Sequence, residues 1–204
     1  MAQDQLETKA LLEIKDLYVE YVPDDTTVYA VNGLNLTVNR GETLGLVGET
    51  GAGKTTTALS VLKLLPDRVS FIRNGSIKLD NMDITAATEA DMRLLRGHIV
   101  SMIFQDPMTS LNPVHTVGDQ IAEVLELHKI CKTKDEVSKR VDEILELVGL
   151  PAERKSEFPH QFSGGMKQRI VIAMALACQP KLLLADEPTT ALDVTIQAQV
   201  LQMM

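Results

Sequence analysis

The sequence predicts an α/β fold in which strands surround a glycine-rich loop. Three observations predict it: alternating apolar residues near the start, a glycine-rich loop between an apolar strand and a helix, and a later apolar strand that ends in two acids. The 204 residues suit one domain, or one domain that carries a subdomain.

The first forty residues predict antiparallel strands. Apolar and polar residues alternate over 12–21 and again over 34–38, and a turn-rich stretch at 23–27 separates the two runs. Residues 76–79, followed by the polar turn Asp80-Asn81, predict a further hairpin.

Two short apolar runs predict buried strands. Residues 43–47 (TLGLV) and 181–185 (KLLLA) lack alternation, as expected of strands that are buried on both faces. The first run leads into the glycine-rich loop and then into a helical pattern from Lys54 to Leu65, which Pro66 stops.

The middle of the chain predicts helices. Residues 88–91 and 133–136 have the spacing of capping boxes. Apolar residues recur at helical spacing over 117–148, and glycine and proline at 149–151 supply a stop. A helical apolar face is also expected over 196–204.

Composition excludes several classes of protein. The longest uncharged apolar run, Ile170 to Cys178, is far short of the ~20 residues that cross a bilayer, and no signal peptide is visible. A net charge of −8 and 3% aromatic residues argue against a nucleic-acid partner. Cys131 and Cys178 form neither a disulfide framework nor a metal motif, which fits a reducing cytosolic setting.

The glycine-rich loop matches the GxxxxGK[ST] pattern of a phosphate cradle. Glycines allow successive N–H groups to face phosphate oxygens, and the following helix directs its positive end to the same place. Lys54 can reach the β- and γ-phosphates, and the Thr55 hydroxyl can bind Mg²⁺. An ordinary glycine-rich turn is the alternative. The expected nucleotide-binding residues are Gly48, Glu49, Thr50, Gly51, Ala52, Gly53, Lys54, Thr55 and Thr56.

The later strand ends in Asp186 and Glu187. An aspartate at the end of a buried strand can hold Mg²⁺, and the next glutamate can deprotonate water for attack on the γ-phosphate. The alternative is that the two acids cap or solubilise the end of the strand. Beside the phosphate cradle, phosphoryl transfer to water is the favoured reaction.

Residues 162–169 (FSGGMKQR) resemble the signature loop, LSGGQ, of the ABC (ATP-binding cassette) ATPases, with Phe162 for Leu and Met166 for Gln. The resemblance implies a P-loop NTPase (RecA-like) core with an N-terminal antiparallel β-subdomain and an inserted α-helical subdomain. It also implies ATP and Mg²⁺ as ligands. The active unit would be a head-to-tail dimer, in which Ser163, Gly164 and Gly165 face the ATP of the other cassette.

Further segments resemble family elements in the same order. Residues 104–107 (FQDP) resemble the Q-loop, whose Gln105 would sense Mg²⁺ and the γ-phosphate, and Asp193 lies in a segment like the D-loop. Tyr21 is in register with the aromatic residue that stacks on adenine, with Tyr29 as a substitute. The resemblance thus implies Glu187 and Gln105 as catalytic residues. The implied metal ligands are Thr55, Gln105 and Asp186.

The same resemblance divides the chain and predicts that it is incomplete. Residues 1–87 and 163–204 would form the α/β core with the β-subdomain, and 88–162 the Q-loop and helical subdomain. The family's switch histidine should follow the catalytic glutamate, but no histidine follows Glu187. We therefore expect a fragment that binds ATP and hydrolyses it slowly or not at all.

Residues 104–113 (FQDPMTSLNP) and 163–166 (SGGM) are most similar to the ATP-binding subunits of dipeptide, oligopeptide and nickel importers. This implies uptake of peptides, or less often of nickel or another small solute, in a prokaryote. The implied partners are a second ATPase subunit, identical or not, two membrane-spanning permease subunits, and an extracytoplasmic binding protein reached through the permease. The permease would contact residues 105–113 and the helices that follow, which places the chain at the cytoplasmic face of the membrane.

Two other classes stay open. An ABC ATPase that acts in DNA repair or on the ribosome would be expected to carry coiled-coil insertions, paired cassettes or basic surfaces, which the sequence lacks. A non-catalytic nucleotide-binding regulator is disfavoured by the intact Lys54, Asp186 and Glu187, but the absent histidine keeps it open.

Overall fold

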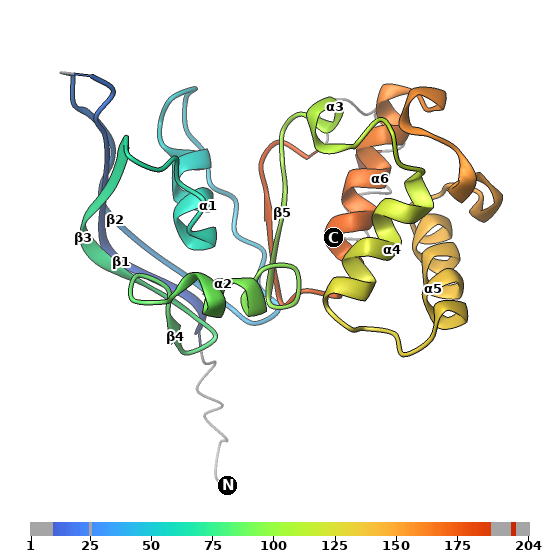
Figure 1. The fold of residues 1–204 in the computed structure, drawn as a ribbon. Coiled ribbons are helices and arrows are strands. Elements are labelled where there is room, and N and C mark those ends of the chain that lie inside the picture. Colours follow the sequence, from blue (N-terminus) through green and yellow to red (C-terminus); the bar gives the residue numbers. More distant parts are fainter. Residues whose placement is uncertain (1–9, 25, 189–196, 199–204) are drawn as a thin grey trace, which may run out of the picture. The chain divides into compact units, whose positions relative to one another are not determined.

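The computed structural model describes residues 10–24, 26–188 and 197–198. The chain forms two compact units, Met1–Arg93 and Leu94–Met204, and each is described by itself. The helical face predicted over 196–204 lies mostly outside the described residues. In this α/β chain, the first unit carries an antiparallel sheet and the second carries helices beside a short parallel sheet (Figure 1).

The first unit confirms the predicted antiparallel strands. Its sheet has the order β2-β1-β3-β4, and each neighbouring pair is antiparallel. The hairpin turn at Asp80 and Asn81 has φ of 46° and 74°, as a tight turn between adjacent strands requires. The strands are β1 (Ala10–Tyr21), β2 (Val28–Asn39), β3 (Ser70–Leu79) and β4 (Met82–Asp83).

A bulge at Asp16 keeps the apolar face of β1 continuous. Ile14 pairs with Leu36 of β2, the register then shifts, and Leu17 pairs with Leu34. Asp16 itself has φ of 49°. The extra residue shifts the alternation by one position, so the apolar side chains before and after it are buried on one face.

Helix α1 (Lys54–Leu62) contacts β2 and β3. It ends before the predicted stop at Pro66 because Lys63 turns into the left-handed region (φ 54°) and its N–H bonds back to the carbonyls of Leu59 and Ser60.

Helix α2 (Glu89–Leu95) follows β4 and begins at the predicted capping box. The Thr88 N–H donates to the Asp91 carboxylate, 2.9 Å away, and the Asp91 N–H donates to the Thr88 hydroxyl.

The strand predicted over 43–47 is wrong. These residues have no regular structure, and Leu44, Leu46 and Val47 are 45%, 44% and 94% exposed. A strand that is buried on both faces needs hydrogen-bonded neighbours at both edges. Within the described part of this unit, the four strands pair only with one another, so this run has no such neighbour.

The second unit combines two parallel strands with a group of helices. Strand β5 (Val100–Ile103) pairs in parallel with β6 (Leu182–Ala185), which confirms the second predicted strand. Its expected burial on both faces is wrong, because only Leu182 of β6 is buried and Ala185 is exposed. The helical elements are α3 (Pro107–Ser110), α4 (Val117–Leu127), α5 (Lys134–Leu147), η1 (Ala152–Ser156), η2 (Pro159–Gln161) and α6 (Gly164–Leu176).

The apolar faces of α4, α5 and α6 form the core of this unit. Ile121 of α4, Ile144 of α5 and Ile170 of α6 are almost completely buried in one cluster. The predicted capping box that begins α5 is present, since Thr133 and Glu136 exchange hydrogen bonds. These three helices therefore hold the short parallel sheet and the segment before α6 in place.

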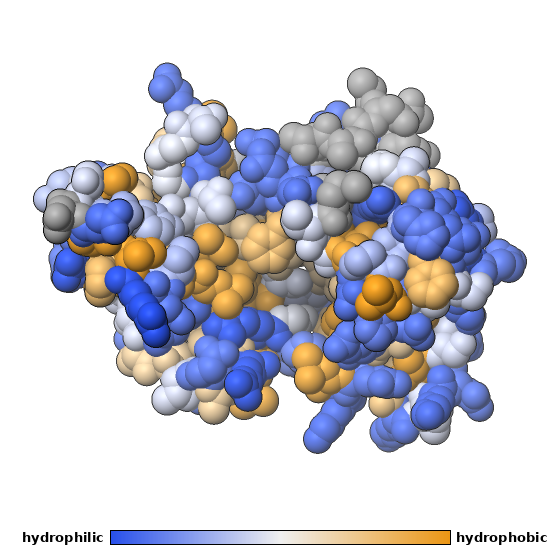
Figure 2. All heavy atoms as spheres, turned by 45° about the horizontal axis from the view of Figure 1, so that its top comes forward, coloured by the Kyte–Doolittle hydropathy of each residue, from blue (hydrophilic) through white to orange (hydrophobic). Residues whose placement is uncertain are grey.

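None of the described helices is both long enough and apolar enough to pass through a bilayer. In Figure 2, hydrophilic side chains cover much of the visible surface, and apolar patches lie between them.

Candidate functional site

The glycine-rich loop ends in a turn whose last residue, Gly53, can only be glycine. Gly51 and Gly53 have φ of 85° and 83°. A Cβ on Gly53 would lie 2.2 Å from the carbonyl oxygen of Ala30, so both the backbone conformation and the contact exclude a larger residue. Gly53 is also the residue that caps α1. The loop therefore ends where the positive end of the helix begins.

The ammonium group of Lys54 folds over this loop. Its Nζ donates to the carbonyl oxygens of Gly48, at 2.6 Å, and Glu49, at 2.9 Å. The residues from Gly48 to Ala52 are exposed. The structure thus places the predicted residues 48–56 in an exposed loop and the helix start that follows it, with a positive charge directly over the loop backbone.

Tyr21 ends β1 beside this helix start. Its hydroxyl lies 3.4 Å from the Thr56 Oγ1, within hydrogen-bonding distance. Tyr29, the alternative aromatic residue, lies on β2 and is 63% exposed. The contact with Thr56 favours Tyr21 as the aromatic residue beside the loop.

In the second unit, the predicted acids follow β6. The Asp186 N–H donates to the Ile103 carbonyl at 3.0 Å, which extends the β5–β6 pairing to the acid. The Gln105 Nε2 donates to the Glu187 Oε2 at 2.8 Å, so two residues 82 positions apart are brought together. Glu187 has φ of 49°, in the left-handed region that glycine favours.

The signature segment begins α6. Ser163 is the N-cap, and its hydroxyl accepts the Met166 N–H at 3.4 Å. Both Ser163 and Gly164 are exposed. A Cβ on Gly164 would meet no atom within 4 Å, so packing within the described chain does not require glycine there.

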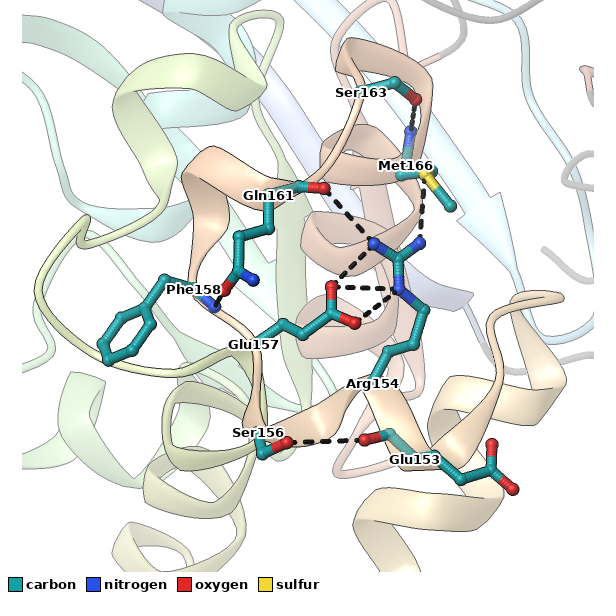
Figure 3. A network of polar contacts seen from close by, with 8 residues as sticks. All are labelled: Glu153, Arg154, Ser156, Glu157, Phe158, Gln161, Ser163 and Met166. Atoms are coloured by element: carbon teal, nitrogen blue, oxygen red, sulfur yellow. Dashed lines mark hydrogen bonds and ion pairs between the residues drawn. The ribbon is translucent and has the colours of Figure 1, made fainter.

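Arg154 binds the segment before the signature (Figure 3). Its guanidinium donates to the Glu157 carboxylate, at 2.6 Å from Nη2, and to the Gln161 carbonyl oxygen, at 3.2 Å. It also lies 3.5 Å from the Met166 sulfur. The centre of the Phe162 ring is 4.2 Å from the guanidinium carbon. Hydrogen bonds with Arg154 lower the pKa of Glu157, and Glu157 raises the pKa of Arg154. The sequence patterns do not single out Arg154; its one signal is the spacing of three residues to Glu157.

The predicted metal ligands suit Mg²⁺ by their chemistry. Mg²⁺ prefers oxygen donors and takes only one or two carboxylates from the protein. Taken one by one, Thr55 in the first unit and Gln105 and Asp186 in the second unit each offer an oxygen donor of this kind. Among the described residues, no group of three or more His, Cys, Asp or Glu side chains could hold a metal ion. Asp193, the predicted D-loop residue, lies outside the described residues.

Known proteins resemble nearly the whole chain. The oligopeptide transport ATP-binding protein OppD of Bacillus subtilis is 51% identical over 196 residues, which cover 95% of this chain and 54% of that protein. The dipeptide transport ATP-binding protein DppD of the same organism is 50% identical over 195 residues, which cover 95% and 58%. This chain therefore spans between half and two thirds of the length of these relatives.

A solved structure shares the fold. The ATP-binding cassette MJ0796, determined as a dimer in a post-hydrolysis state with ADP and Pi, superposes with a TM-score of 0.85 and 27% identity over 94% of this chain and 80% of that one. A family model described as ABC transporter matches residues 31–190, which is most of the sequence. On this evidence, the chain is a member of the ABC transporter family.

Proposed function

We propose that this chain is the ATP-binding and ATP-hydrolysing part of an importer for dipeptides or oligopeptides. The observation that carries the proposal is the loop before α1, where Lys54 lies over exposed backbone and the Ala30 carbonyl leaves no room for a side chain at Gly53. This arrangement is suited to the phosphates of a nucleotide.

The residues of the two units have separate chemical roles. Backbone N–H groups of the loop and Lys54 bind the phosphates, and the Tyr21 ring stacks on adenine. Glu187 accepts a proton from water as the water oxygen attacks the γ-phosphorus and the bond to the β–γ bridging oxygen breaks. Gln105 orients the Glu187 carboxylate through the hydrogen bond between them.

Thr55, Gln105 and Asp186 would hold Mg²⁺. When bound, Mg²⁺ neutralises phosphate charge. The oxygen-donor chemistry of these side chains supports this assignment.

A second ATPase subunit would complete the active unit. Ser163 and Gly164 form an exposed helix start, a suitable site for an anion. The open space around Gly164 leaves room for the nucleotide of a partner. The dimeric state of MJ0796 supports this pairing, either with a second copy or with a sister subunit. Asp193 would lie near the seam of this dimer, as the sequence resemblance implies.

The names of the relatives support peptide transport. We propose that residues 88–162 form the Q-loop and the helical subdomain, which receives two permease subunits that span the membrane and meet an extracytoplasmic binding protein. A cavity of about 490 Å³ beside α4 supports the docking of a cytoplasmic permease segment, and such docking would put the chain at the inner face of a prokaryotic membrane. Asp119 and Glu123 favour a basic segment there. The cavity is lined by residues of the α3–α4 segment and α6, among them Ser110, Asn112, His115, Asp119, Glu123 and Met174.

Phosphate release tests the enzymatic part of the proposal. The wild-type chain is expected to release phosphate from ATP with Mg²⁺, at a rate that a sensitive single-turnover assay detects. Glu187→Gln should lower this rate by at least about a hundredfold, as expected for loss of a general base, and should keep ATP binding. An unchanged rate in Glu187→Gln would remove Glu187 as the base.

The neighbouring reading frames test the transport part. Adjacent genes for two permease subunits and a peptide-binding protein are expected. A nickel-binding protein in the same cluster would replace peptides as the cargo, and neighbours for DNA repair or translation would contradict import.

A further inference from the structure

Gln168 is a buried amide whose placement is not explained by packing. It lies in the second turn of α6, five residues after the signature Ser163, and its side chain has no exposed surface. Its Oε1 has no hydrogen-bond partner among the described residues. Because an unpaired buried acceptor destabilises a fold, an apolar side chain of the same length would serve packing better.

The amide nitrogen of Gln168 binds the backbone directly after Glu187. The Gln168 Nε2 donates to the Pro188 carbonyl oxygen at 2.6 Å. Proline has no N–H, so this carbonyl is the only backbone group of Pro188 that can form a hydrogen bond. Gln168 therefore fixes the peptide that follows the proposed base.

Glu187 needs such support because of its backbone conformation. A φ of 49° is unfavourable for a residue with a Cβ and persists only where neighbouring contacts maintain it. Gln105 holds the Glu187 carboxylate from the segment after β5, and Gln168 holds the next carbonyl from α6. Two amides on different elements thus fix the side chain and the backbone of the same glutamate.

We infer that Gln168 is a positioning residue for hydrolysis, which links the signature end of α6 to Glu187. This inference rests on the proposed function. The helix between Ser163 and Gln168 is regular and short, so a displacement of its N-terminus on contact with a partner's ATP moves the Gln168 amide. The hydrogen bond to Pro188 then transmits that movement to the base. Contact across the dimer and activation of water are coupled through one side chain.

Gln168→Leu tests the link, because leucine has a side chain of similar size and lacks both polar atoms of the amide. We expect the turnover number of the variant to fall at least tenfold while the KM for ATP stays within twofold of the wild type. The melting temperature should stay the same or rise, because the unpaired oxygen is removed. Amide hydrogen exchange at Asp186 and Glu187 should become faster. Gln168→Met provides a second apolar variant if leucine packs poorly.

Gln179→Leu is the matched control, since Gln179 is an exposed glutamine just after the same helix. It should change none of these quantities. If the wild type hydrolyses ATP, its turnover number is the deciding quantity. The inference is overturned if Gln168→Leu keeps a turnover number within twofold of the wild type. It is also overturned if turnover falls only together with a lower melting temperature in both apolar variants, and in both cases the proposed function stays intact.

An inactive wild-type chain would instead count against the proposed hydrolysis. Hydrogen exchange then decides the inference by itself. Faster exchange at Asp186 and Glu187 in Gln168→Leu supports it, and unchanged exchange overturns it.

Discussion

The amide of Gln105 donates to the carboxylate of Glu187 over 2.8 Å, although the two residues are 82 positions apart. The parallel pairing of β5 with β6 produces this contact, because Gln105 and Glu187 each follow the end of one of these strands. Residues after the carboxyl ends of parallel strands meet at one edge of a sheet, the usual place for a site in α/β folds.

Removal of the Gln105 amide should impair hydrolysis and spare binding. Gln105→Ala leaves the Glu187 carboxylate without this donor, and a carboxylate that loses its orientation is expected to lower turnover by about ten- to a hundredfold. The ATP dissociation constant should stay within about twofold. Phosphate release and equilibrium binding measure the two quantities. Gln179→Ala is the control, and an equal effect of both variants would contradict the role of Gln105.

Replacement by alanine should affect stability at Gly53 and hydrolysis at Gly164. Gly53→Ala introduces a Cβ at φ 83° and 2.2 Å from the Ala30 carbonyl oxygen, and should lower the free energy of unfolding by more than about 1 kcal/mol. Gly164→Ala meets no neighbouring atom and should change that free energy by less than about 0.5 kcal/mol. It should nevertheless lower hydrolysis, because the new methyl group occupies the proposed approach of the partner's nucleotide. Urea unfolding and phosphate release distinguish the pair; full hydrolysis in a stable Gly164→Ala would exclude the contact in trans.

Mild acid should destabilise the second unit through His128. This imidazole lies against Gly97, where an added Cβ would be 2.4 Å from its Nε2. Burial, together with the neighbouring His98, lowers the pKa of His128 below the ordinary value of 6.5. The unfolded chain therefore binds more protons than the folded chain between these two pKa values, and the free energy of unfolding falls as the pH falls through that interval.

The comparison of urea midpoints at pH about 7.5 and about 5.5 measures this effect, because unfolded histidine titrates in this range. His128→Gln should show a smaller loss than the wild type. Equal losses in the two proteins would assign the acid sensitivity to other groups.

Local structure could be predicted from the sequence, and contacts between residues that are distant in the sequence could not. The capping boxes at Thr88 and Thr133 and the glycine-rich loop depend on neighbours within a few residues, so their spacing is sufficient. The strand expected over 43–47 failed because its stability depends on strands elsewhere in the chain. The roles of Arg154 and Gln168 depend on side-chain contacts that no sequence period reports.

The same distinction between local motifs and long-range contacts applies to the candidate site. The motifs identify Lys54, Asp186 and Glu187 by residue type and spacing, but the donor that reaches Glu187 and the carbonyl groups that hold Lys54 are visible only in three dimensions.

Equilibrium binding of ATP to the wild type, to Lys54→Ala and to Lys78→Ala tests the central claim most directly. Lys78 is an exposed lysine on β3 of the same unit, so its removal controls for the loss of one positive charge. Lys54→Ala should weaken binding by about ten- to a hundredfold, the value of a hydrogen bond from a charged donor, and Lys78→Ala should bind as the wild type does. Equal affinities in all three proteins would show that ATP does not bind at residues 48–56.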